Sequence, residues 1–177
     1  TTTGSDGTFE EALFCAGFLQ PEDGLLLIGA DEYHETLSPL FDPSITLSGP
    51  PADGGGALFL TRARSGASCK VEPLFIGFSD CGDSLISDVV ARLGGGDRIR
   101  DQFGLILAGI PAAQRDKGAA QLKEFLLLTE FSHPVVDYRR YVGEFASASA
   151  VAAVWAVGCV EAGKIPGPFC GGDTFPL

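Results

Sequence analysis

Basic residues are scarce in this chain. Its 177 residues include 12 Lys and Arg against 23 Asp and Glu, which gives a formal net charge of −11 at pH 7. A surface that binds nucleic acid needs clustered Lys and Arg to face the phosphates, so the composition argues against a nucleic-acid partner. The charge balance instead favours a soluble acidic protein.

Other absences narrow the class of protein further. The chain has no Met, and no signal peptide or basic targeting arm is visible. Its five cysteines form no C-x-x-C pair and are odd in number, so neither a zinc site nor a disulfide framework is expected. We therefore expect reduced thiols, a cytoplasmic location, and neither a metal nor another cofactor.

The hydrophobic content of 45% is sufficient for one domain with a substantial core, so residues 1–177 are expected to form a single domain. Short apolar runs alternate with helical patterns, which predicts an α/β fold whose strands are connected by crossover helices. The expected strands are Leu25–Ala30, buried on both faces, Ala57–Arg62, Val71–Phe78, the interior strand Phe103–Ile110, and Pro134–Asp137. The expected helices are Thr8–Leu19, Cys81–Leu93, Ala112–Leu128 and Phe145–Val160.

The last of these helices lies in Tyr141–Pro166, the stretch around which the chain is organised. Nearly all residues from Phe145 to Val160 are Ala, Ser, Val, Gly or Trp, and a helix that is apolar all round is expected to be buried. Its small residues predict a close approach of neighbouring backbones, and Gly163 marks its end. With 16 residues, two of them serines near one end, it is too short and too polar for a membrane span.

Three segments together resemble the ketosynthases of the thiolase-like fold. The first is GEFASASAVAAVWAVGCVEAGKIPG, which resembles a C-terminal half with a Gly-His dipeptide, a small-residue helix and a closing G-x-I-P. The others are DGTFEEALFCAGFLQPEDGLLLIGADEYHETLSPLFDPS, similar to the helix after the nucleophile with its following strand, and ADGGGALFLTRA, similar to the glycine-rich start of the next strand. The resemblance implies a layered α-β-α arrangement. A ketosynthase has a large N-terminal portion without a counterpart here, so the fold is expected to be incomplete or completed by another chain.

The resemblance also identifies positions that correspond to an active site. In an active ketosynthase a Cys thiolate accepts the acyl chain, and two further side chains, usually His, assist decarboxylation of the malonyl unit and stabilise the enolate. The nucleophile would fall near Thr2 or Thr3, and the first His near Ala108 or Gly109. The second His would fall at Glu144, and the Lys associated with it near Arg139. Because the expected reactive side chains are absent, Thr2, Arg139 and Glu144 are expected to be non-catalytic.

The two histidines leave other kinds of chemistry open. On helical spacing His34 could join Asp31 and Glu35 as a metal site, although a solvated acidic loop explains these residues equally well. His133 and Asp137 could belong to a Ser-His-Asp triad, but no G-x-S-x-G elbow is present. The runs DGGG and GGGD lack the Lys-Ser/Thr of a phosphate-binding loop and are interpreted as turns.

The leading hypothesis is a catalytically degenerate ketosynthase-like subunit, similar to a chain-length factor, that shapes an acyl pocket beside an active β-ketoacyl synthase. The resemblance implies a role in fatty-acid, polyketide or polyene biosynthesis, a dimer, and as partners an acyl carrier protein and a ketosynthase or second chain carrying the N-terminal strands. One alternative is an atypical active acyltransferase that uses Glu144, Arg139 or a hydroxyl near the N-terminus and shares its site with a second chain. Another is a binding or structural module without acyl chemistry.

Overall fold

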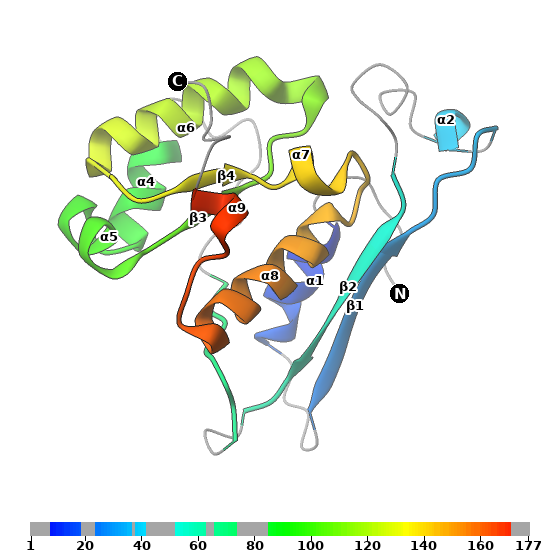
Figure 1. Ribbon diagram of the computed structural model, residues 1–177, viewed down its shortest axis with the longest axis horizontal. Helices are drawn as coiled ribbons and strands as arrows, with labels where there is room; N and C mark the ends of the chain where they lie inside the picture. Colours follow the sequence, from blue (N-terminus) through cyan, green and yellow to red (C-terminus); the bar gives the residue numbers. More distant parts are fainter. Residues whose placement is uncertain are drawn as a thin grey trace. The chain divides into compact units, whose positions relative to one another are not determined.

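The computed structural model describes residues 8–18, 24–36, 38–41, 52–62, 66–73 and 85–170. These segments combine helices with two small sheets, in agreement with the general α/β class (Figure 1). The chain divides into two compact units, the first formed by Thr1–Pro73 and Tyr138–Lys164, and the second by Leu74–Asp137 and Ile165–Leu177. In the described segments, no helix has the length and apolar character needed to cross a membrane.

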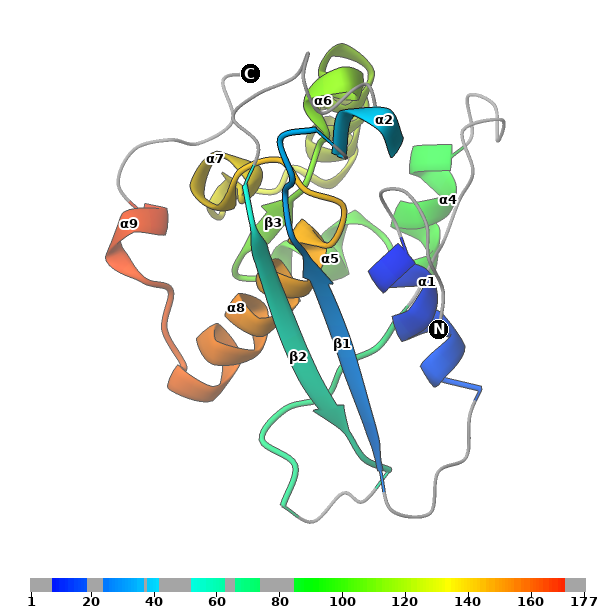
Figure 2. The same cartoon turned by 90° about the vertical axis from the view of Figure 1, so that its right-hand side faces the viewer.

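The first unit is built around a pair of antiparallel strands. In chain order its elements are α1 (Thr8–Ala16), β1 (Leu25–Asp31), α2 (Ser38–Phe41), β2 (Gly54–Leu60), α7 (Arg139–Val142) and α8 (Ala148–Ala162). β1 and β2 form a ribbon in which Leu25 is paired with Leu60, and Asp31 with Gly54. α1 and α8 pack on one face of this β1–β2 ribbon (Figure 2).

Small residues bring α8 very close to the β1–β2 ribbon. A Cβ atom on Gly56 would lie 2.4 Å from the carbonyl oxygen of Ala150, and one on Gly29 would lie 2.9 Å from the Ala150 Cβ. Beside this contact, Phe9 and Leu58 are buried with Ala150 in one hydrophobic cluster. The prediction that the small residues of this helix permit a close approach of neighbouring backbones is confirmed.

The burial of α8 differs between its two halves. Ala148, Ala150 and Ala152 are buried, whereas Val154 and Val160 are 38% and 63% exposed. The prediction of a buried helix is therefore correct for the first half only, which is the half that contains the close contact with the ribbon. The predicted end is correct, since Gly163 follows the helix with a φ of 61°, in the left-handed region that glycine adopts readily.

β1 lies where a strand was predicted, but the expectation that both its faces are buried is wrong. Leu26 and Ile28 are 57% and 62% exposed, whereas Leu27 faces the helices. The physical reason is that a two-stranded antiparallel ribbon needs a covering layer on one face only. β2 begins three residues before the predicted strand, at Gly54, and its antiparallel pairing replaces the crossover connection expected between these strands.

The second unit contains the parallel strand pair. Its elements are α4 (Leu85–Arg92), α5 (Gly96–Gln102), β3 (Ile106–Ala108), the 3-10 turn η1 (Ala112–Gln114), α6 (Arg115–Thr129), β4 (Val135–Asp137) and α9 (Gly167–Cys170). β3 and β4 are parallel and are connected through α6, which is the crossover arrangement predicted from the sequence. The core beside them contains Ile110 and Val135, against which Leu122, Leu126 and Phe131 pack.

Two further strand predictions, for Phe103–Ile110 and for Val71–Phe78, need correction. The strand expected over Phe103–Ile110 is limited to β3, and its residues are half-buried because β3 pairs with β4 alone in the described segments. Val71–Pro73, the described part of the strand expected over Val71–Phe78, is not a strand, and the remainder lies outside the described residues. The apolar runs at these positions therefore do not show that the residues lie in the interior of a wide sheet.

Candidate functional site

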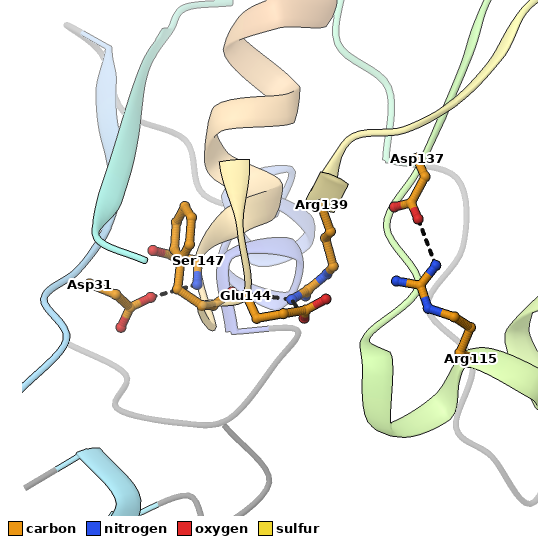
Figure 3. A network of polar contacts seen from close by, with 7 residues as sticks. Asp31, Arg115, Asp137, Arg139, Glu144 and Ser147 are labelled. Carbon is orange, nitrogen blue, oxygen red and sulfur yellow. Dashed lines mark hydrogen bonds and ion pairs between the residues drawn. The ribbon is translucent and has the colours of Figure 1, made fainter. Parts of the chain in front are cut away.

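Arg139 and Glu144, which the resemblance matches to active-site positions, lie at the two ends of a tight turn. Arg139 is the first residue of α7, and Gly143 ends this helix with its N–H donating to the Arg139 carbonyl oxygen at 2.8 Å. The φ of Gly143 is 87°, a backbone conformation that glycine adopts without a steric cost. This reversal returns the chain toward α7 and places the carboxylate of Glu144 beside the guanidinium of Arg139 (Figure 3).

Arg139 and Glu144 form a largely buried ion pair. Nη1 of Arg139 donates to Oε2 of Glu144 at 3.0 Å, and the two side chains are only 4% and 13% exposed. The same nitrogen lies 3.4 Å from the carbonyl oxygen of Phe145, so the guanidinium also binds the backbone immediately before α8. A buried charge of this kind is tolerated only while its partner is in place. The pair therefore holds together the connection between α7 and α8.

Asp31 fixes the start of α8 from the other side. Its Oδ2 accepts a hydrogen bond of 2.5 Å from the backbone N–H of Ser147, the residue before the first turn of α8 (Figure 3). A carboxylate at this position satisfies one of the N–H groups left over at a helix start and interacts favourably with the helix dipole. Because Asp31 is the last residue of β1, the bond joins the ribbon to α8.

The hydrogen bond from Ser147 to Asp31 bears on the alternative of a metal site formed by Asp31, His34 and Glu35. His34 accepts a hydrogen bond from the Thr36 N–H through Nδ1 at 3.2 Å, and its own N–H donates to Ser38 Oγ at 2.8 Å. Within the described ranges, His, Cys, Asp and Glu side chains do not gather in any group of three that would suit a metal ion. The structure thus does not bring Asp31, His34 and Glu35 together as ligands.

Two hydroxyl groups are buried near the start of α8. Neither Ser147 Oγ nor Ser149 Oγ has a hydrogen-bond partner in the described part of the chain, although both atoms are shielded from solvent. A buried hydroxyl without a partner lowers stability, because its bonds to water are lost and not replaced. Both serines lie in the segment that the sequence predicts to be buried, but no local pattern signals that their hydroxyl groups lack partners.

A second buried carboxylate lies in the other unit. Asp137, the last residue of β4, has a side chain with 0% exposure, and its Oδ2 accepts a 2.8 Å bond from Nη1 of Arg115 at the start of α6. His133, the proposed triad partner of Asp137, instead packs its ring against Phe131 with 5.5 Å between centroids. The structure therefore pairs Asp137 with an arginine that sequence reasoning did not single out.

The remaining family positions are less informative. Ala108 is the last residue of β3 and is paired with Asp137 in the parallel ladder, so it offers only a methyl group where the resemblance expects an imidazole. Thr2, the position nearest to the expected nucleophile, lies outside the described residues.

The chemistry available to the Arg139–Glu144 pair differs from that of two imidazoles or of His with Lys. An ionised carboxylate only accepts hydrogen bonds, so Glu144 cannot donate one to a developing enolate. Its negative charge would also oppose the charge of that enolate. Arg139 donates through Nη1 to Glu144 and to the Phe145 carbonyl. The arrangement is suited to holding a backbone turn.

A scan against protein-family models and searches of curated proteins and of solved structures gave no match to this chain.

Proposed function

We propose that this chain is a catalytically degenerate ketosynthase-like subunit of the thiolase-like fold, which acts beside an active β-ketoacyl synthase in fatty-acid, polyketide or polyene assembly. In this role it shapes the acyl pocket of the complex, as a chain-length factor does, and meets acyl chains presented by an acyl carrier protein.

One observation carries the non-catalytic part of this proposal. The two positions where the resemblance expects His and Lys hold Glu144 and Arg139, and these side chains neutralise one another in a buried ion pair. A pair that is used to fix the connection into α8 is not open to a malonyl group, and Glu144 has no proton to donate when ionised. The geometry thus supports a structural role at the place where an active relative would carry out decarboxylation.

The experiment that tests this proposal has two parts. First, the purified chain is incubated with malonyl-acyl carrier protein, and the mass of the carrier is followed, with an active β-ketoacyl synthase as the positive control. We expect the synthase but not this chain to decarboxylate the malonyl group. Turnover by this chain alone would refute the degenerate assignment.

Second, the chain is added to an active β-ketoacyl synthase that makes products of several lengths. We expect the product-length distribution to change with increasing chain concentration, whereas an equal amount of the Arg139→Ala variant, in which the start of α8 is released, has a weaker effect. A distribution that is the same with and without this chain would contradict a role in shaping the pocket.

The alternative is an atypical acyltransferase whose site is shared with a second chain. The buried carboxylate of Glu144, 13% exposed, is the observation that favours it. It predicts a covalent acyl adduct on this chain, visible by intact mass after incubation with acyl carrier protein and the second chain. An adduct that is lost in Glu144→Gln but kept in Glu161→Gln, an exposed glutamate on α8, would favour this alternative.

A further inference from the structure

We draw no further inference here: the strongest candidate, the pair of buried hydroxyl groups of Ser147 and Ser149 at the start of α8, belongs to the site already described, and nothing among the described residues shows what these hydroxyl groups would bind beside the carboxylate of Asp31.

Discussion

Removal of Glu144 should destabilise the first unit strongly, because it leaves the guanidinium of Arg139 buried without its carboxylate. Arg139 is 4% exposed as a side chain, so water cannot replace the lost partner without a rearrangement of the turn. Breaking a buried ion pair from one side typically costs about 3–5 kcal/mol. We expect Glu144→Ala to lower the free energy of unfolding by this amount, and Glu144→Gln, which keeps an oxygen acceptor, by about 1–3 kcal/mol.

Urea denaturation followed by circular dichroism and by Trp155 fluorescence measures this loss. Trp155 is the only tryptophan and lies on α8, with its ring 6.4 Å from that of Tyr141 on α7, so its emission reports on the elements that the ion pair connects. Glu72→Ala provides the control, because the Lys70–Glu72 pair is 79% and 57% exposed. A surface pair of this type contributes no more than about 1 kcal/mol.

The double variant Arg139→Met/Glu144→Leu separates the cost of an unpaired charge from the value of the pair. Replacing both partners by apolar residues of similar volume is often neutral, so the double variant should be more stable than Glu144→Ala. Two results would contradict the structural role of the ion pair. One is a loss of unfolding free energy in Glu144→Ala that is no larger than in Glu72→Ala. The other is a loss in the double variant that equals the sum of the losses in the single variants Arg139→Met and Glu144→Leu.

Three further predictions concern the packing and start of α8. Gly56→Ala should destabilise the protein by about 1–3 kcal/mol, because the new Cβ would lie 2.4 Å from a carbonyl oxygen of α8. Gly158→Ala should stabilise the protein by about 0.5–1 kcal/mol, because its Cβ would meet nothing within 4 Å. Thermal unfolding measures both changes in stability, and changes of the same sign would contradict the close contact at Gly56. Asp31→Ala should cost about 0.5–2 kcal/mol in denaturant unfolding through loss of the bond to the α8 start, and an unchanged midpoint would show that this bond contributes nothing. Ser149→Ala should be neutral or stabilising, since it removes a buried hydroxyl without a described partner, so a clear loss of stability would show that a bound water or other group satisfies this hydroxyl.

Local patterns predicted those elements whose formation depends on neighbouring residues. The apolar run at Leu25–Ala30 indicated β1, the composition of the segment after Ala112 indicated α6, and Gly163 marked the end of α8. Partners and covered faces could not be read in this way. The same run would suit a strand in the middle of a wide sheet, and only the antiparallel pairing with β2 determines that Leu26 and Ile28 face outward.

In the candidate site, too, contacts between residues close in sequence could be predicted, whereas contacts between distant residues could not. Arg139 and Glu144 are five residues apart around Gly143, so an arginine, a glycine and a glutamate at this spacing are a signal from which their pairing could have been inferred. The bond from Ser147 to Asp31 spans 116 residues, and the one from Arg115 to Asp137 spans 22. Such contacts depend on how whole elements pack, and no local pattern contains that information.

The ion pair also bears on the proposal that Glu144 and Arg139 stand where a ketosynthase has His and Lys. The resemblance implies two separate departures from His and Lys at Glu144 and Arg139, whereas the structure joins these residues by a 3.0 Å bond between largely buried side chains. Each side chain therefore helps to stabilise the charge of the other. If the proposed relation to ketosynthases holds, Glu144→His alone should not restore decarboxylation, because an imidazole does not replace the carboxylate to which Arg139 donates. Under that proposal both positions would have to change together, because a single substitution removes one partner of the ion pair and leaves the other in place.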